Sequence, residues 1–265
     1  QTIYYTSKNP VTLLSERIMR HHLGDDETKD AVVYHEKDNT NYIGVVKSKN
    51  KKYIFIASEG TLSSEWRIAD ANISTADFIV FQPRMKDVLY SVYAVDDRFY
   101  ILTNKDGAEN FKLMACPLDA TLEANWKDVI PHRKDVLLEG VEEFKNFLAI
   151  QERSAGLPKI RIFGKDSGKD HYVDFEQPDY VARIVGGHDY NSDEVMYYFS
   201  SFITPASFFD YNVIKRTKEL KKQVEVGGGF NPSDYYNERI YAKAGDGTMI
   251  PISLVYKKGV KKDGH

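Results

Sequence analysis

Among the adjacent acids and histidines of this 265-residue chain, two acidic pairs and one histidine pair are considered first for proton transfer or metal binding. Asp96-Asp97 and Glu142-Glu143 have the residue types of a general acid and base, and His21-His22 have those of metal ligands. Neighbours in a β-strand point to opposite faces, so neither kind of pair can converge on one substrate or ion. We interpret the acids as solvated loop or edge charges, and we expect no metal and no cofactor.

A nucleophilic serine would be expected in a Gly-x-Ser-x-Gly pattern at a strand-turn-helix elbow, and the sequence contains no such pattern. The nearest approaches, Ser154-Ala155-Gly156 and Ser167-Gly168, have the composition of turns. Gly227-Gly228-Gly229 could suggest a phosphate-binding loop, but Asn231-Pro232 leads to another strand and not to the required helix N-terminus. We interpret these glycines as a flexible linker and assign no catalytic residue.

The elements that must carry these residues recur along the chain. An apolar, aromatic-rich strand returns at steps of roughly 46 to 51 residues, and a second strand follows each within a hairpin-length connection. The five first strands are predicted at 3–7, 53–58, 100–104, 148–153 and 195–201. The second strands are predicted at 17–22, 65–69, 111–116, 159–163 and 207–211. The repeat predicts a series of antiparallel hairpins.

Further short β-type runs between these hairpins bring each unit to four strands. They lie at 31–34, 42–46, 78–81, 89–94, 171–175 and 180–185. Runs such as 54–56 and 197–199 are apolar throughout, which is typical of inner strands covered on both faces. The sequence therefore predicts an all-β protein, a β-propeller of about five four-stranded blades, whereas a seven-bladed ring at this period needs roughly 340 residues.

Composition limits the possible partners. The 36 basic and 39 acidic residues leave a net charge of −3, which argues against nucleic acid and an anionic membrane surface. The basic residues Lys257-Lys258 and Lys261-Lys262 are too few for a nucleic-acid site, so we expect a solvated loop. The lone Cys116 lies in a predicted strand and is expected to be a buried thiol. No run approaches the roughly 18 apolar residues of a membrane helix, and we expect a cytoplasmic location, with the periplasm left open.

The organisation of the sequence changes after the fifth unit. A glycine-rich segment is followed by a predicted hairpin of strands 239–243 and 248–256. We place a domain boundary near Gly228. Residues 1–228 are then the propeller segment, and residues 229–265 are a linker or hinge and the start of another domain.

Five pieces of sequence, taken together, carry a family resemblance. They are 9–14 (NPVTLL), 34–40 (YHEKDNT), Glu152-Arg153 with Gly156-Leu157, Ser200-Ser201 with Thr204-Pro205, and the tail from Glu238-Arg239 through Asp246-Gly247 to 253–256. With these pieces the chain resembles, from end to end, the oligopeptidase B (protease II) branch of the prolyl oligopeptidase family of serine peptidases. The resemblance implies the later blades of a seven-bladed propeller and the opening hairpin of an α/β-hydrolase peptidase domain, with the catalytic Ser, Asp and His beyond His265.

The function that this resemblance implies is that of a serine oligopeptidase cleaving short peptides after basic residues. Its propeller would restrict entry to the site, and this chain alone would be inactive. The implied partners are short peptide substrates and the C-terminal peptidase domain, and exposed blade faces also predict self-association. Two alternatives stay open: a stand-alone propeller that binds protein or carbohydrate, and a propeller-fold glycosidase with paired carboxylates.

The segment after the fifth unit is the candidate hinge between propeller and peptidase domain. The glycines at 227–229 would supply backbone freedom, and aromatic and basic side chains beyond them would supply the interdomain contact. The candidate residues are Gly228, Phe230, Tyr235, Tyr236 and Arg239. A passive linker is the alternative.

Overall fold

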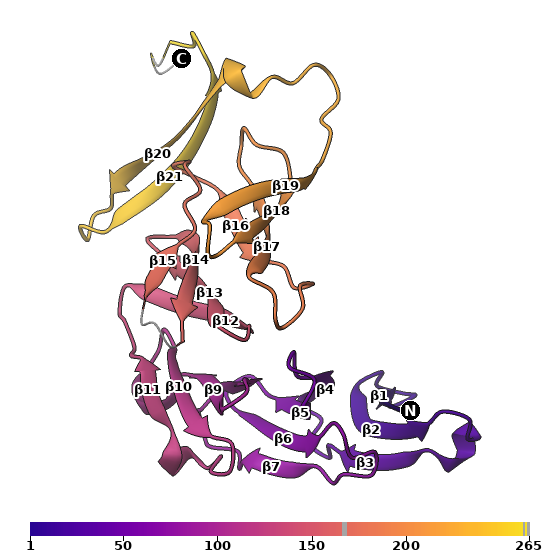
Figure 1. Cartoon of the computed structure of the whole chain (residues 1–265). Helices are drawn as coiled ribbons and strands as arrows, with labels where there is room; N and C mark the ends of the chain where they lie inside the picture. Colours follow the sequence, from indigo (N-terminus) through magenta and orange to yellow (C-terminus); the bar gives the residue numbers. More distant parts are fainter. Residues whose placement is uncertain (166–168, 262, 264–265) are drawn as a thin grey trace. The chain divides into compact units, whose positions relative to one another are not determined.

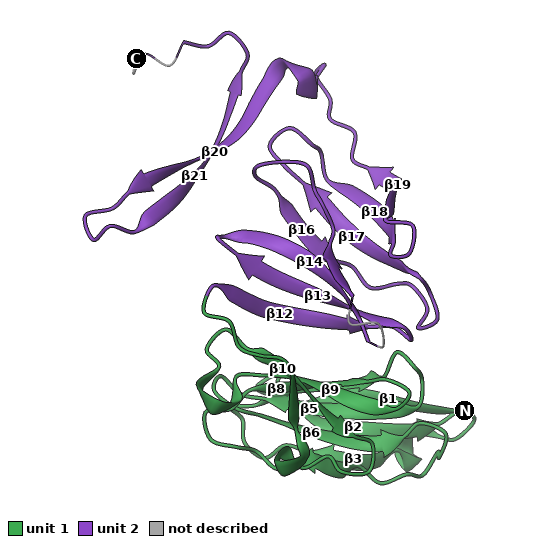
Figure 2. Cartoon of the chain, turned by 60° about the vertical axis from the view of Figure 1, so that its left-hand side comes forward, with its two compact units in different colours: residues 1–134 green, residues 135–265 purple. Residues whose placement is uncertain are grey.

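The computed structural model describes residues 1–165, 169–261 and 263, and the chain divides into two compact units, Gln1–Lys134 and Asp135–His265 (Figures 1 and 2). The regular structure of the described residues consists of β-strands and four short 3-10 helices, without an α-helix. In this part of the chain no helix has the length and apolar character needed to cross a membrane. The turn predicted at Ser167-Gly168 and the end of the basic tail at Lys262 lie outside the described residues.

Unit 1 contains three antiparallel sheets whose strands follow one another in chain order. The first sheet consists of β1 (Thr2–Lys8), β2 (Ser15–His22) and β3 (Ala31–His35). The second consists of β4 (Tyr42–Lys47), β5 (Tyr53–Glu59), β6 (Ser64–Asp70) and β7 (Ile79–Gln82). The third consists of β8 (Tyr90–Ala94), β9 (Arg98–Thr103), β10 (Lys112–Pro117) and β11 (Lys127–Ile130).

Unit 2 contains two further four-stranded antiparallel sheets and a hairpin. The fourth sheet consists of β12 (Val136–Glu143), β13 (Phe147–Ser154), β14 (Leu157–Gly164) and β15 (Asp170–Tyr172). The fifth consists of β16 (Val181–Ile184), β17 (Glu194–Ser200), β18 (Ser207–Asn212) and β19 (Thr217–Gln223). The hairpin pairs β20 (Tyr235–Lys243) with β21 (Met249–Lys257).

Every strand predicted from the sequence overlaps a strand of the structure, and four strands per repeat are found in the second to fifth sheets. The sequence did not predict β11, β12 and β19. All seven residues of β19 are exposed, so this outer strand, with the sequence TKELKKQ, has no apolar face to reveal it. In β12 the pairing register shifts between Leu138 and Gly140, and this bulge breaks the alternation by which strands are identified.

The core of each unit lies between neighbouring sheets. One cluster joins the second and third sheets and includes Phe55, Phe81 and Phe99, all at most 2% exposed. Another joins the fourth and fifth sheets and includes Phe147 and Tyr197. A single sheet could not cover both of its apolar faces, so the repeats must stack on one another to be stable.

The single thiol belongs to this interior. Cys116 on β10 is 2% exposed, and burial raises the pKa of its thiol to about 12. At neutral pH the group is therefore protonated and a poor nucleophile. The predicted buried thiol is confirmed.

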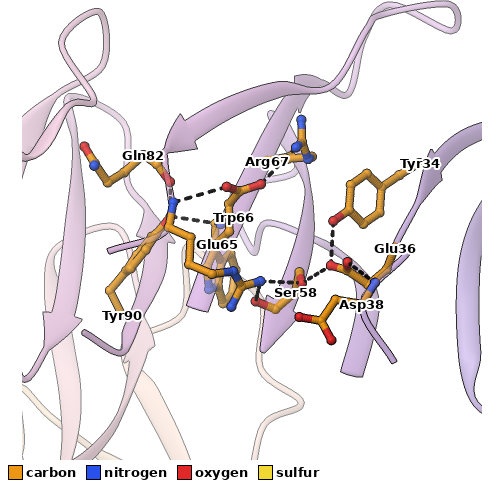
Figure 3. A network of polar contacts seen from close by, with 10 residues as sticks. Tyr34, Glu36, Asp38, Ser58, Glu65, Trp66, Arg67, Gln82 and Tyr90 are labelled. Atoms are coloured by element: carbon orange, nitrogen blue, oxygen red, sulfur yellow. Dashed lines mark hydrogen bonds and ion pairs between the residues drawn. The ribbon is translucent and has the colours of Figure 1, made fainter. Parts of the chain in front are cut away.

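A polar network joins the first and second sheets of unit 1 (Figure 3). The Glu36 carboxylate accepts hydrogen bonds from the Tyr34 hydroxyl at 2.8 Å, the Ser58 hydroxyl at 2.5 Å and the Asp38 amide at 3.0 Å. Burial alone would raise the pKa of Glu36, but these hydrogen bonds together hold it below its ordinary value. Arg84 extends the network by donating to the Ser58 hydroxyl at 2.7 Å.

Tyr90 makes a corresponding link between the third and second sheets (Figure 3). Its hydroxyl donates to the Gln82 carbonyl at 2.6 Å and accepts from the Trp66 amide at 2.9 Å. The side chain is 2% exposed, and burial raises its pKa. In unit 1, hydrogen bonds therefore fix the contacts between sheets that the apolar clusters stabilise.

Candidate functional site at the C-terminal hairpin

The structure separates the two acidic pairs by environment. Asp96 and Asp97 lie between β8 and β9 with side chains 44% and 60% exposed, which confirms solvated loop charges. Glu142 and Glu143 end the edge strand β12, but Glu143 is only 9% exposed, so the expectation of a solvated charge was wrong there. The bulge at Glu139 explains this, because it moves the inward positions of β12 from even to odd residue numbers.

The adjacent histidines have separate partners. The Nδ1 atom of His21 lies 2.6 Å from a carboxylate oxygen of Asp30, and the Nδ1 atom of His22 lies 3.1 Å from the Thr2 hydroxyl. Because β2 pairs with β1 and β3 on its two sides, the two imidazoles contact different segments.

One group with metal-ligand chemistry was missed by the sequence analysis. His188, Glu194 and Asp210 bring one nitrogen and two carboxylates within 4.8 Å of one another. The imidazole already binds Asp210 at 2.7 Å, and the Lys221 ammonium lies 3.7 Å from the other oxygen of that carboxylate. This positive charge opposes a cation at the same place. The three residues come from a loop and two strands, so no spacing in the sequence indicates the group.

Of the predicted hinge residues, Gly228 and Phe230 lie between β19 and the hairpin, whereas Tyr235, Tyr236 and Arg239 lie on β20 itself. Gly228 and Gly229 have φ angles of +79° and +73°, a region that favours glycine. A short 3-10 helix, Pro232–Asp234, then leads into β20. The rings of Phe230 and Tyr235 stack across this helix with centroids 5.7 Å apart. The segment therefore combines a glycine linker with an ordered entry into the hairpin.

The hairpin has two chemically different faces. Side chains alternate along β20, so Tyr235, Asn237 and Arg239 share one face, while Tyr236 and Ile240 share the other. Cross-strand pairing places Ile252 opposite Ile240 and Tyr256 opposite Tyr236. On this second face Tyr236 is 50% exposed, Ile240 43%, Ile250 48% and Ile252 36%. The first face carries Asn237 and Arg239 but also the exposed side chains of Tyr241, Met249 and Val255, and we call it the polar face for its two hydrogen-bonding residues. The second face is an exposed, largely apolar surface.

Arg239 on the polar face contacts two separate segments of unit 2. Its Nη1 atom lies 3.0 Å from a carboxylate oxygen of Asp179, which precedes β16. Its Nη2 atom donates to the carbonyl of Ala155, in the turn between β13 and β14, at 2.8 Å. The side chains of Arg239 and Asp179 are only 9% and 13% exposed. The pair is therefore weakly screened, unlike an ion pair at the surface.

A second residue of the same face supports this contact. The side-chain amide of Asn237 donates to the backbone carbonyl of Asp179 at 3.0 Å and to Gln177 Oε1 at 3.5 Å. Gln177 in turn donates to the Thr204 hydroxyl at 2.8 Å. The hairpin is thus attached both to the segment before β16 and, through Gln177, to the loop between β17 and β18.

Gly156 provides the space for the guanidinium group. Its φ angle is +77°, and a Cβ atom built on it would lie 2.8 Å from Nη2 of Arg239. Sequence analysis singled out Arg239 but used Gly156 only as a turn residue and as part of a family motif, and it missed Asp179 and Asn237. We name the set Asn237, Arg239, Asp179, Ala155 and Gly156 the hairpin clamp.

Comparison with known proteins places this architecture in a family. The family described as "Prolyl oligopeptidase, N-terminal beta-propeller domain" matches residues 1–224. The chain is 39% identical over 265 residues to dipeptidyl aminopeptidase BI of Pseudoxanthomonas mexicana, covering all of this chain and 36% of that protein. It is 28% identical to protease 2 of Moraxella lacunata, covering 94% of this chain and 35% of that protein. The chain thus spans about a third of the length of these relatives.

A solved structure extends the similarity through the hairpin. Oligopeptidase B from Leishmania major matches with a TM-score of 0.89 and 28% identity over 99% of this chain and 38% of that one. The prediction of an all-β fold made of propeller blades is confirmed. The chain belongs to the prolyl oligopeptidase family, and its residues 1–224 correspond to the N-terminal β-propeller domain of that family.

Proposed function

We propose that this chain is the substrate-gating part of a serine oligopeptidase that cleaves short peptides after basic residues. The similarity to oligopeptidase B, which continues through the hairpin, is the observation that carries the proposal. Sheets that pack on one another through buried apolar clusters resist deformation. Such a body can exclude folded proteins while extended peptides pass to a desolvated site. The chain contributes selection by size, and the nucleophile belongs to a peptidase domain.

The apolar face of the hairpin supports a peptidase domain as the partner. Tyr236, Ile240, Ile250 and Ile252 line up on this face and remain exposed. A two-stranded ribbon is only marginally stable without a covered apolar face. We propose that the peptidase domain of the longer protein covers it, whereas a stand-alone binding module leaves the hairpin without a role.

A different cleavage specificity has its own support. The relative with 39% identity is named a dipeptidyl aminopeptidase, so release of dipeptides from free N-termini is the second candidate. The two activities are distinguished by the state of the peptide N-terminus. An enzyme that cleaves after basic residues accepts an N-terminally blocked Arg-Arg fluorogenic peptide, whereas an enzyme that releases dipeptides from free N-termini does not. An unblocked dipeptidyl substrate reports dipeptide release.

The first test compares this chain with a longer protein in which a peptidase domain follows it. We expect the longer protein to cleave the blocked Arg-Arg peptide and to be labelled by a fluorophosphonate, and the chain alone to do neither. If the longer protein neither cleaves nor labels, the peptidase proposal is wrong and a binding module is favoured. Cleavage by the chain alone would contradict the assignment of the nucleophile to the peptidase domain.

The hinge is tested by adding a methyl group to one glycine at a time. Gly228 has a φ of +79°, where alanine is disfavoured by about 1–2 kcal/mol, so Gly228→Ala should alter the linker and change turnover in the longer protein. Gly227 is the matched control, because it has no such φ and no atom near its Cβ position. Equal kcat values for the parent protein and Gly228→Ala would remove the support for a hinge at this glycine.

A further inference from the structure

We propose that the hairpin clamp locks β20 and β21 onto the fourth and fifth sheets, so that the glycine linker can act as a hinge only after the clamp opens. The chain leaves the fifth sheet at the end of β19 and passes through the linker to β20 (Figure 1). On β20, Asn237 and Arg239 bind back to Asp179, before the fifth sheet, and to Ala155 in the fourth sheet. A linker whose two ends are attached to the same body permits no rotation between bodies. The clamp therefore controls whether the linker is used.

The chemistry of Arg239 suits a lock better than a transient surface contact. Its planar guanidinium donates in two directions, to the Asp179 carboxylate and to the Ala155 carbonyl. A lysine ammonium is a point charge and would not reproduce this forked geometry. Since both charged side chains are largely buried, ordinary salt concentrations should screen the pair only weakly.

The outer half of the hairpin adds little apolar packing to this attachment. Tyr241, Ile250 and Ile252 remain between 36% and 50% exposed, so apolar packing holds the outer half of the hairpin only weakly. Pro251 approaches the Gly156 Cβ position at 3.9 Å, an ordinary van der Waals distance. The polar contacts of Arg239 and Asn237 therefore position the hairpin against the fourth and fifth sheets.

The lock can be measured on this chain by the distance between two spin labels. One label replaces Lys215, exposed in the turn after β18, and the other replaces Met249, which is 54% exposed at the start of β21; Cys116→Ser removes the native thiol. We expect one narrow distance distribution for the parent chain and loss of the narrow component in Arg239→Met and Asp179→Ala. Arg239→Lys should lose part of it. An unchanged narrow distribution in both of the first two variants overturns the clamp.

Two matched controls separate the clamp from general effects: one accompanies the charge variants, and the other, Gly107→Ala, accompanies the further test variant Gly156→Ala. Lys257→Met removes a positive charge from the same face of the hairpin at an exposed position far from the label, and it should leave the narrow distribution intact. Gly156→Ala should reduce the narrow component, because Nη2 of Arg239 must move away from the added methyl group. Gly107→Ala imposes similar backbone strain, with a φ of +73° and nothing within 4 Å, and should have no effect. Loss of the narrow component in either control would show that the distribution does not report the clamp.

The consequence for the hinge rests on the proposed function and is tested in the longer protein. If the clamp controls the linker, the change in kcat caused by Gly228→Ala should differ between the parent protein and Arg239→Met. Equal changes in the two backgrounds would show that linker and clamp act independently. The spin-label measurement needs no peptidase domain, so the clamp and the peptidase function can fail separately.

Discussion

Replacement of Glu152 by alanine is expected to lower the free energy of unfolding of unit 2 by about 3 kcal/mol. Glu152 lies on β13 with its side chain fully buried. The carboxylate accepts a hydrogen bond from the Tyr172 hydroxyl at 2.8 Å and lies 3.4 Å from Nη1 of Arg161. Its removal leaves the tyrosine hydroxyl without this acceptor and part of the arginine charge without its counter-ion, next to a position that is fully buried.

Glu139→Ala is the matched control, because it removes another glutamate paired with an arginine in the same sheet. The side chains of Glu139 and Arg153 are 25% and 45% exposed, so the loss should stay within about 1 kcal/mol. Chemical denaturation followed by far-ultraviolet circular dichroism measures both variants. Both tryptophans, Trp66 and Trp126, lie in unit 1, so their fluorescence reports that unit separately. Equal losses for the two glutamate variants would contradict the argument from burial.

The contrast between these residues shows which features a sequence can predict. The strands were predictable because alternation and apolar runs are local, as in β5, where Ile54, Phe55 and Ile56 are all buried. The exposed strand β19 was not, because neither of its faces is apolar. Glu152 was singled out only as part of a family motif, and nothing in its neighbours reveals that Tyr172 and Arg161 surround it.

The candidate site was predictable only in part, for a related reason. The glycine linker and the hairpin are local patterns, and both led to Arg239. The partners of Arg239 lie 60 and 84 residues earlier in the chain, at Asp179 and Ala155. Gly156 has the composition of an ordinary turn until the guanidinium beside it is seen. Contacts between repeats depend on how sheets stack, which the pattern within one strand does not specify.

Phe99→Ala is expected to lower the free energy of unfolding of unit 1 by about 3–5 kcal/mol. Phe99 on β9 is 1% exposed and lies between two sheets. Its ring centroid lies 5.1 Å from Phe81 and 5.2 Å from Tyr53, with Phe55 at 6.3 Å, and all three belong to the second sheet. Truncation removes these contacts together and leaves a cavity in the contact between repeats.

Tryptophan fluorescence during denaturation measures this loss, because Trp66 lies 5.7 Å from Phe55 in the same cluster. Phe99→Leu keeps most of the volume and should cost less than about 1.5 kcal/mol. Tyr42→Ala truncates an aromatic side chain of the second sheet that is 70% exposed, and should change stability by no more than about 0.5 kcal/mol. If stacking between sheets stabilises the repeats, the second and third sheets must both lose stability in Phe99→Ala. Hydrogen exchange accelerated in the third sheet alone would show that each sheet is stable by itself.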